Sequence, residues 1–545
     1  MLNELRIPEM ADANFLTLII LTAPALFLLT SIIARSKPGT RPLAVIRAGM
    51  AATGASLIAS VYGIIVVCLF GLTEGTIVEV SGIGLSFRLD PLSMLMFTMI
   101  ALLGFVVLKY SRNYLDGDAR HGVFIGRLAS TIAAVQLLVL SGNLLVLFLA
   151  WIMTSLMLHR LLIFYPERRR AVIAARKKFI VARLGDIFLL AASVLMYIQY
   201  STGNLQLIFD ALKGSNRPPY TVEIAAVFLA FAALLKSAQF PTHGWLIEVM
   251  ETPTPVSALL HAGLLNAGPF LMVRMAYVIS RAEAASIVLI VFGGLTALLA
   301  SISYTTQPSI KTALGYSSAA HMGFMLLVCG IGVFPAAMLH LVAHSFYKAH
   351  AFLSSGSAVD IRRASKVPEP KRIGSPIRIV ASVIISFVVY LGFAMLWRIN
   401  PANDFALLAT GAIVVMGLSQ IIAPALDSDG YFATTLRAIL LTLLVAASFF
   451  TLESVFHHVL YSQLPPPSKP DTATILLTVA VLIVFGLTVL AQIWAPAAKQ
   501  SIFRQKIGVH FRNGFYMNAL FDRLTGAFSV SSPAKTRRPF EYRSN

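Results

Sequence analysis

The chain has 545 residues, of which 57% are hydrophobic and 12% are charged, and its formal net charge at pH 7 is +19. This composition and a mean hydropathy of +0.79 exclude an ordinary soluble globular protein, in which about a quarter of the residues are charged. The positive charge does not indicate a nucleic-acid partner, because basic loops are typical of membrane proteins and no nucleic-acid-binding motif is evident. We therefore expect an all-α polytopic membrane protein that lies in the lipid bilayer.

Apolar runs of about 20 residues, the length that crosses about 30 Å of hydrocarbon, recur along the chain. The first follows the acidic start Met1–Asp12 and is long enough to stay in the membrane, so no cleaved signal is expected. We predict about fifteen transmembrane helices, with ends accurate to a few residues. They lie at 13–34, 43–71, 91–110, 121–140, 143–164, 177–199, 221–239, 255–280, 285–305, 311–332, 335–358, 375–398, 403–424, 432–452 and 472–495.

The basic residues collect in loops of one parity, at 35–47, 160–178 and 362–378, and in the tail after Lys499. The positive-inside rule then predicts an N-terminus outside and a C-terminus in the cytoplasm. Arg274 and Arg281 do not fit this pattern, which suggests that a helix boundary near them is wrong.

Four stretches lie outside the apolar runs. Thr76–Leu89 alternates and contains two glycines, which predicts a small outer hairpin. Leu464–Pro470 has four prolines and is expected to be an outer loop. After Trp494 the tail mixes basic and aromatic residues and is expected to lie along the inner surface or hold a partner, and the last fifteen residues are expected to be disordered.

The stretch from Lys236 to His261 has the most unusual chemistry in the chain. It lies between the apolar runs 222–235 and 264–273, and it carries a lysine, two histidines, two glutamates and three prolines. Ionisable groups are costly inside a bilayer, and irregular backbone there must line protein or water. The stretch therefore predicts a path for ions. The alternative is a surface loop whose charges are solvated.

Several further residues are candidates for the same path. His340, His344 and Lys348 are spaced i, i+4, i+8, so a helix places them on one face, where imidazoles can pass protons. A structural hydrogen bond to a backbone carbonyl is the usual alternative for a single histidine. Lys236 and Lys311 lie near the ends of apolar runs and serve either a relay or simple snorkelling to the interface.

Acidic residues near these positions are also candidates. Arg183 and Asp186 are i, i+3 neighbours that are expected to pair. Glu248 and Glu251 are one helical turn apart, and the prolines that follow them are expected to begin or break a helix and leave backbone groups free for water. Cys68 and Cys329 stand alone in apolar runs, so neither a disulfide nor a metal site is expected.

Residues 85–360 resemble the antiporter-like membrane subunits of respiratory complex I and of multi-subunit cation/proton antiporters, the proton-conducting membrane transporter family. The resemblance is carried by long motifs, which are LDPLSMLM at 89–96, SGNLLVLFLAW at 141–151, KKFIVARLGD at 177–186, KSAQFP at 236–241, PTPVSALLHA at 253–262, SIKTALGYSSAAHMG at 309–323 and HLVAHSFYKAHAFLSSGS at 340–357.

The resemblance implies an antiporter-like fold of two inverted five-helix repeats, each with a broken helix. The expected division is 1–120 for N-terminal helices with the hairpin, 121–280 and 281–425 for the repeats, and 426–545 for C-terminal helices and a basic cytoplasmic tail. It also implies a central polar axis through the residues that match the motifs, namely Lys236, His261, Lys311, His340, His344 and Lys348.

The chain departs from the family pattern at three places. Ile152 follows Trp151 where the family has a glutamate, residues 392–400 lack the family's lysine and acid, and Glu251 is an added acid. The versions of the motifs at 175–186 and 244–268 are similar to those of membrane subunits of DAB-type inorganic-carbon accumulation complexes. That similarity implies a cytoplasmic zinc-containing partner of the DabA type, related to β-carbonic anhydrases, and no cofactor or catalysis in this chain.

Three functions are consistent with the sequence. The first is a cation-conducting subunit, for protons in particular, that energises a carbon-hydrating partner. The second is a pumping or antiporter subunit of a complex I-like, hydrogenase-linked or Mrp-type complex. The third is a membrane anchor that no longer conducts. For conduction, we expect protons to enter from outside near Lys236, Glu248 and Glu251, pass His261 to Lys348, His344 and His340, and leave toward the cytoplasmic partner. The sequence does not distinguish H+ from Na+.

Overall fold

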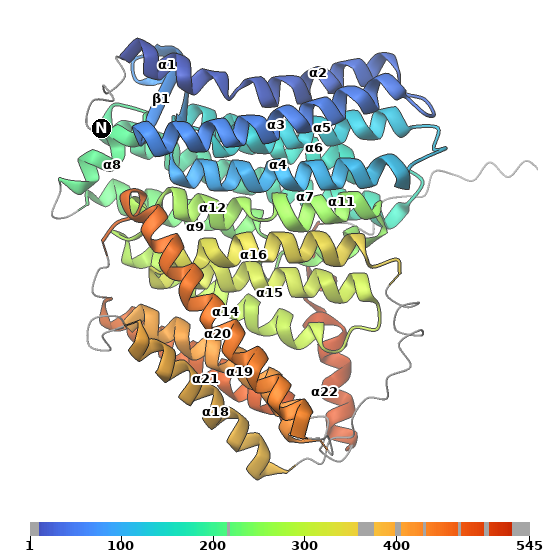
Figure 1. Ribbon diagram of the computed structural model, residues 1–545, viewed down its shortest axis with the longest axis vertical. Coiled ribbons are helices and arrows are strands. Elements are labelled where there is room, and N and C mark those ends of the chain that lie inside the picture. The colour runs from blue at the N-terminus through green and yellow to red at the C-terminus, as the bar shows by residue number, and fades with distance from the viewer. Residues whose placement is uncertain are drawn as a thin grey trace, which may run out of the picture.

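The computed structural model describes residues 10–214, 218–357, 375–397, 405–428, 432–466, 470–494 and 501–525. Most of the basic loop at 362–378 and the last fifteen residues lie outside this range, so the predictions made for them stay predictions. Helices dominate the described chain and run roughly side by side, with the N-terminal helices along one flank and the C-terminal helices along the other (Figure 1).

Two helices of the N-terminal group begin directly after a polar residue that caps them, Asp90 or Asn143. Asp90 accepts a hydrogen bond from the backbone N–H of Ser93 at 2.6 Å and precedes a proline, and Asn143 accepts one from Leu145 at 3.0 Å. Both are favoured starts of a helix. The helices of this group are α1 (Met10–Ile19), α2 (Thr22–Ser36), α3 (Leu43–Phe70), α4 (Pro91–Tyr114), α5 (His121–Val139) and α6 (Leu144–Leu162).

The central group contains two interruptions. The chain leaves the helix after Lys236, and a π turn at Leu260–Leu264 divides the helix that follows Pro253. The elements are α7 (Arg169–Tyr200), α8 (Leu205–Lys213), α9 (Tyr220–Lys236), α10 (Gly244–Glu248), a 3-10 turn (Val249–Glu251), α11 (Thr254–Leu259), α12 (Ala267–Arg274), α13 (Ala276–Ile279), α14 (Glu283–Tyr304), α15 (Ile310–Ile331) and α16 (Phe334–Leu353).

The C-terminal group packs on the central group through α20 (Phe432–Leu460). This long helix crosses the front of Figure 1 from the C-terminal flank to the beginning of α16. The elements are α18 (Pro376–Leu396), α19 (Phe405–Leu426), α20 (Phe432–Leu460), a 3-10 turn (Tyr461–Gln463), α21 (Thr472–Trp494), α22 (Ile502–Arg512), a 3-10 turn (Gly514–Tyr516) and α23 (Met517–Thr525). α18 is continuous, so the second broken helix that the resemblance implies is not seen there.

The all-α polytopic class is confirmed. Within the described residues, thirteen helices are long and apolar enough to cross a membrane. The predicted segments 221–239 and 335–358 also form helices: α9 has 17 residues, and α16 carries the predicted row of two histidines and a lysine. The division into two inverted repeats stays a prediction.

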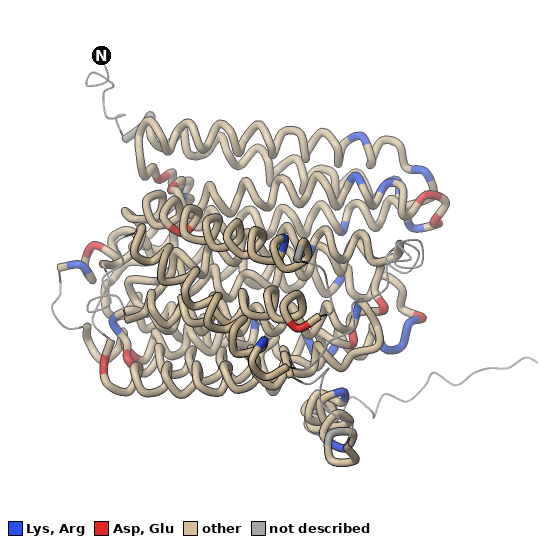
Figure 2. Tube along the Cα trace, turned by 60° about the horizontal axis from the view of Figure 1, so that its bottom comes forward, with Lys and Arg blue, Asp and Glu red and all other residues tan. Residues whose placement is uncertain are grey.

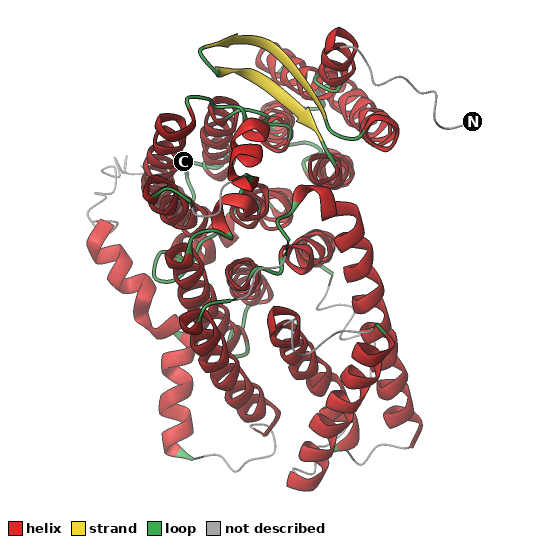
Figure 3. Ribbon diagram, turned by 90° about the vertical axis from the view of Figure 1, so that its left-hand side faces the viewer, coloured by secondary structure: helices red, strands yellow, loops and turns green. Residues whose placement is uncertain are grey.

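The predicted hairpin is present, although it begins at Thr73. Strands β1 (Thr73–Val80) and β2 (Ile83–Leu89) pair antiparallel, with an irregularity between Thr76 and Val78. The turn residues Ser81 and Gly82 both have positive φ, at 52° and 76°, which matches the twist of a two-residue hairpin turn. The hairpin lies across one end of the helices (Figure 3).

The two ends of the helix bundle differ in charge. The hairpin, the end of α7 and the end of α12 lie at one end, which we call the hairpin end. The basic residues before α3 and at the start of α7 lie at the opposite end, which we call the basic end, and Figure 2 shows lysines and arginines gathered there. The positive-inside rule favours a cytoplasmic basic end, but the orientation of the chain stays a prediction.

Candidate ion path

Lys236 is the last residue of α9, at a break in the helix. Ala238 has a positive φ of 53° and Pro241 follows, so the helix does not continue. The Lys236 Nζ lies 3.0 Å from the Trp151 carbonyl oxygen and 3.0 Å from the Thr154 Oγ1, and 4.2 Å from the centre of a Trp151 ring. The partners in contact with this ammonium are therefore neutral acceptors and an aromatic face.

A second lysine lies beside Lys236 and was assigned to a basic loop in the sequence analysis. Lys178 is buried, and its Nζ donates to the Ser155 carbonyl oxygen at 2.7 Å and to the Ser155 Oγ at 3.1 Å. The same Oγ lies 3.4 Å from the Lys236 Nζ. Its spacing of i, i+8 to Asp186 is the signal that could have placed Lys178 on the polar face of α7.

The predicted pair of Arg183 and Asp186 is present, with the Nη2 of Arg183 2.7 Å from the Oδ2 of Asp186. The carboxylate is largely buried, and its charge acts on Lys236 and Lys178 as well. Asp186 therefore supplies negative charge to the two lysines, next to the place where the chain has Ile152 instead of an acid.

Glu248 and Glu251 lie at the basic end. Both Glu248 carboxylate oxygens are 2.7 Å from the Lys177 Nζ, and the Oε1 of Glu251 is 3.7 Å from the Nη1 of Arg170. Lys177 and Arg170 belong to the first turns of α7. The expectation that both glutamates lie at an outer entrance conflicts with this arrangement, because they lie on the side opposite the hairpin.

The C-terminal segment closes over Glu248. Asn518 on α23 donates to the Glu248 Oε1 at 2.8 Å, and Asp522 forms an ion pair with Lys177. The Oδ1 of Asn518 lies so near Gly244 that an added Cβ there would clash with it. α23 is thus fitted closely against the basic end of the predicted path.

His261 lies in the π turn between α11 and α12, a type of turn that is frequent at functional sites. It is fully buried, and its ring stacks on Phe352 with 4.4 Å between ring centres. Neither ring nitrogen has a hydrogen-bond partner among the described residues. Buried polar groups of this kind are normally satisfied by ordered water, or they serve a function.

The predicted row on α16 is joined by a histidine that the sequence analysis missed. The Nδ1 of His321, on α15, lies 2.9 Å from the Nε2 of His340, and its ring centre lies 5.1 Å from that of His344. Lys348 is buried and donates to the Leu314 carbonyl oxygen at 3.1 Å. Two signals pointed to His321: it stands in an apolar helix, and it belongs to the motif at 309–323.

The polar axis expected from the resemblance is divided into groups. Lys236, Lys178 and Asp186 form one group, and the histidines 321, 340 and 344 form another, with Lys348 and His261 near them. Lys311 lies apart: it is half-buried near the basic end and contacts the Thr254 Oγ1 at 3.1 Å. In the described part of the chain, no group of three or more His, Cys, Asp or Glu side chains is arranged to hold a metal ion.

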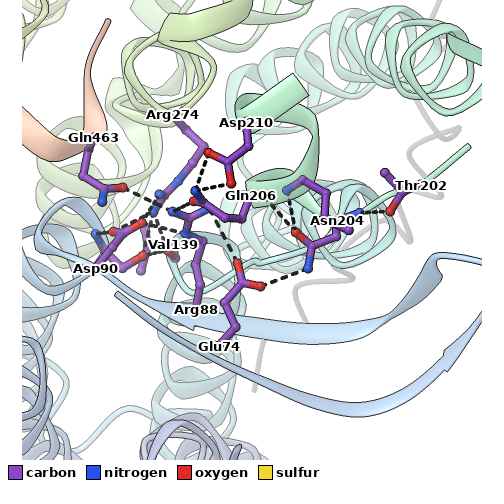
Figure 4. A network of polar contacts seen from close by, with 12 residues as sticks. Glu74, Arg88, Asp90, Val139, Thr202, Asn204, Gln206, Asp210, Arg274 and Gln463 are labelled. Carbon is purple, nitrogen blue, oxygen red and sulfur yellow. Dashed lines mark hydrogen bonds and ion pairs between the residues drawn. The ribbon is translucent and has the colours of Figure 1, made fainter. Parts of the chain in front are cut away.

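A buried ionic network closes the hairpin end (Figure 4). Asp90 forms ion pairs with Arg274 and with Arg88, whose Nε is 2.7 Å away, and the Nη2 of Arg274 donates to the Ser93 Oγ at 2.6 Å. Arg274 therefore fits the topology despite its charge, because its partner Asp90 neutralises it at the end of α12.

Two family models match the chain. The model described as NADH:quinone oxidoreductase/Mrp antiporter, TM, matches residues 141–392, and the model described as complex I chain 5 N-terminus matches residues 78–125. A probable inorganic carbon transporter subunit DabB2 of Halothiobacillus neapolitanus is 34% identical over 94% of each chain. A probable subunit DabB of Hydrogenovibrio crunogenus is 42% identical over 52% of this chain and 55% of its own.

Solved structures show the same fold. The Mrp complex of Dietzia sp. DQ12-45-1b contains a chain with a TM-score of 0.57 and 22% identity, over 94% of this chain and 56% of that one. An archaeal membrane-bound sulfane sulfur reductase contains another, with a TM-score of 0.56 and 16% identity, over 92% of this chain and 99% of that one. This chain belongs to the family of complex I- and Mrp-like antiporter subunits. Within that family its relatives include the inorganic carbon transporter subunits named DabB, and it is a cation-conducting, antiporter-like membrane subunit.

Proposed function

We propose that this chain conducts protons and that the flow drives CO2 hydration, and so inorganic carbon accumulation, in a cytoplasmic partner. The partner is a zinc-containing, carbonic-anhydrase-like protein of the DabA type, and any catalysis belongs to it. The names of the DabB relatives support the carbon substrate. In this proposal the chain lies in a bacterial inner membrane with its N-terminus outside and its basic end in the cytoplasm.

One observation carries the conduction step: Lys236 and Lys178 share the hydroxyl of Ser155 at membrane depth, and the acceptors in contact with them are neutral. A carboxylate in contact with a lysine stabilises its protonated form, so a lysine without such a contact releases its proton more easily. When a second positive charge arrives on the neighbouring lysine, repulsion favours release of the first proton. The shared hydroxyl gives the two lysines a direct link.

The helix directions favour a different order of the path. α16 begins at the hairpin end, so His340 is the member of its row nearest that end and Lys348 is the nearest to the basic end. Protons that enter at the hairpin end would meet His340, His321 and His344 first. They would then pass Lys348 and the central lysines and leave near Glu248.

The C-terminal helix α23 lies where conduction and the partner would meet. It contacts Glu248 and Lys177 on one side and carries the exposed Leu520 and Leu524 on another. Each proton that moves down the membrane potential releases about 2.3 kcal/mol per 100 mV. A movement of α23 driven by charge at Glu248 would deliver part of that energy to a bound partner, without chemistry in this chain.

The test has two parts. The tagged chain is purified from its native membrane, and its partners are identified and assayed for zinc. Gradient-dependent bicarbonate accumulation is then measured for Lys236→Ala and His344→Ala. A zinc-containing partner and loss of accumulation in both variants support the proposal. Unchanged accumulation in both variants contradicts it.

A second candidate is a proton-pumping or antiporter subunit of a complex I-like, hydrogenase-linked or Mrp-type complex. The matched family model and the 34% identity to an NADH-quinone oxidoreductase subunit L of Buchnera aphidicola, over 51% of this chain and 45% of that one, favour it. Co-purification of quinone-module, hydrogenase or antiporter subunits would decide for this candidate. Loss of assembly alone in lysine variants would indicate an anchor that does not conduct.

A further inference from the structure

A cavity of about 460 Å³ lies at the hairpin end, between the start of α16, the start of α19 and the end of α20. Its wall is largely apolar and aromatic. Lining residues from α13, α16, α19 and the 3-10 turn after α20 include Tyr277, Phe334, Pro335, Phe405 and Tyr461. Neither the sequence motifs nor the proposed path uses this cavity.

One carboxylate and one imidazole line the cavity. Glu453 and His457 are four residues apart on α20, so they share one face of the helix. Both belong to a helical span that runs from Ala433 to Gln463 and is apolar enough to cross a membrane. Glu453 lies seven residues before the end of α20, which is about 10 Å along the helix axis. A carboxylate at that depth is costly, and such groups mark ion pathways.

The cavity lies beside the start of the histidine group. Phe334 and Pro335 form its wall, and His340 follows on the same helix about 9 Å deeper. Glu453 lies at a similar depth on α20, which packs against α16. His340 is half-buried and contacts His321, while both ring nitrogens of His344 are buried without a hydrogen-bond partner among the described residues.

The wall of the cavity is fixed by hydrogen bonds from the N-terminal half. The Tyr277 hydroxyl donates to the Leu464 carbonyl oxygen at 3.1 Å, and the Arg88 Nη2 donates to the Gln463 Oε1 at 3.2 Å. Arg88 is part of the buried network around Asp90 (Figure 4). The end of α20 is therefore tied to the hairpin end, and the cavity is a built feature of the fold.

We propose that this cavity is the entrance of the proton path on the hairpin side, and that Glu453 and His457 take up the proton there and pass it on toward His340. This inference rests on the proposed conduction. A carboxylate and an imidazole on one helix face form a pair that exchanges protons, and the surrounding apolar wall limits other exits.

The complex is tested in liposomes with an imposed proton gradient, and the initial flux is read with a pH-sensitive dye. Glu453→Gln is expected to lower the flux at least tenfold, and His457→Gln several-fold. His458→Gln is the matched control, because His458 is the next residue, is exposed and does not line the cavity. Wild-type flux in both the Glu453 and the His457 variants overturns the proposal.

A second measurement avoids variants that fail to fold. Ser462 lines the cavity and is changed to cysteine in a Cys68→Ser background, since Cys68 is the exposed native thiol. A bulky cationic methanethiosulfonate is then added to the folded complex. We expect the flux to fall on labelling and to recover with reductant. Full labelling with unchanged flux overturns the proposed entrance.

Lys348→Met distinguishes failure of the proposed entrance from failure of the proposed conduction. If Lys348→Met abolishes the flux while the cavity variants conduct normally, only the entrance is wrong. If Lys348→Met conducts normally, the proposed conduction is wrong as well.

Discussion

Lys178 and Lys236 approach the same hydroxyl group, that of Ser155, at 3.1 and 3.4 Å. The two lysines come from helices α7 and α9, and the hydroxyl comes from α6. Two ammonium groups this close repel each other, and the repulsion is strong where water is scarce. Asp186 supplies one negative charge to both, so the group accommodates one extra proton more easily than two. This is the property that a relay needs.

Removal of the shared hydroxyl should slow conduction. In Ser155→Ala, Lys178 keeps the carbonyl oxygen of the same residue, while its direct link to Lys236 is lost. Hydrogen bonds to charged groups contribute about 1.5–3 kcal/mol, and about 1.4 kcal/mol is a factor of ten, so we expect an at least tenfold lower proton flux in liposomes. Ser193→Ala is the control, because Ser193 is a buried serine of α7 that bonds only within its own helix. Equal flux in the two variants would remove Ser155 from the path.

Loss of either lysine charge should block conduction without preventing assembly. Lys178→Met and Lys236→Met each remove one site of the relay, and the double variant should be no worse than either single one, since residues that act as a unit are not additive. Flux is measured together with the yield of the assembled complex. A tenfold further loss in the double variant would show that the two lysines act in separate paths.

The sequence predicted the α16 row because its three members are near in the chain and a helix fixes their geometry. It did not single out Lys178, because this residue was counted with the basic loop at 160–178 and stood only second in the predicted helix 177–199. α7 begins at Arg169, so Lys178 lies more than two turns into the helix. His321 meets His340 across two helices. Such contacts depend on tertiary packing, which spacing along one helix does not reveal.

The contact between α23 and α10 at the basic end could not be predicted from the sequence either. Glu248 and Asn518 are 270 residues apart and meet only because α23 folds back over α10. The hairpin was within reach, since its alternation and glycines are local, although its true start at Thr73 lies three residues earlier than predicted. Local patterns therefore gave the helices and the hairpin, while the partners of the charged residues required the structure.

The network at the hairpin end should control stability. Burial alone would raise the pKa of Asp90, but the charges of Arg274 and Arg88 and its hydrogen bonds outweigh burial and hold the pKa of this carboxyl below its ordinary value. Asp90→Asn leaves two buried arginines without this counter-charge, and breaking a buried ion pair costs about 3–5 kcal/mol. We expect a clearly lower midpoint of thermal unfolding in detergent at pH 7.

The same carboxyl makes stability depend on pH. A group whose pKa is lower in the folded state stabilises the fold above its unfolded pKa, which is about 4 for an aspartate, and this contribution is lost as pH falls toward the folded pKa. The temperature of the unfolding midpoint of the wild type should therefore decrease once the pH is lowered beyond about 4. In the same pH range the difference in this temperature between the wild type and Asp90→Asn should become smaller. Glu79→Gln, on the exposed part of the hairpin, is the control. A difference that stays constant down to pH 3 would show that Asp90 acts through packing alone.

The close fit of α23 against Gly244 permits a test of coupling by a single methyl group. An added Cβ in Gly244→Ala would clash with the Asn518 Oδ1, so the Asn518 side chain must move, and we expect its hydrogen bond to Glu248 to be lost. We expect α23 to become more accessible to limited proteolysis and the gradient-dependent activity of the partner to fall several-fold. Gly508→Ala is the matched control, since an added Cβ on α22 meets nothing within 4 Å.

The outcomes distinguish conduction from coupling. If proton flux and partner activity fall together in Gly244→Ala, Gly244 belongs to the path itself. If flux persists while partner activity falls, α23 is the mechanical link between them. Full partner activity with a proteolysed α23 would contradict any role for this helix in coupling.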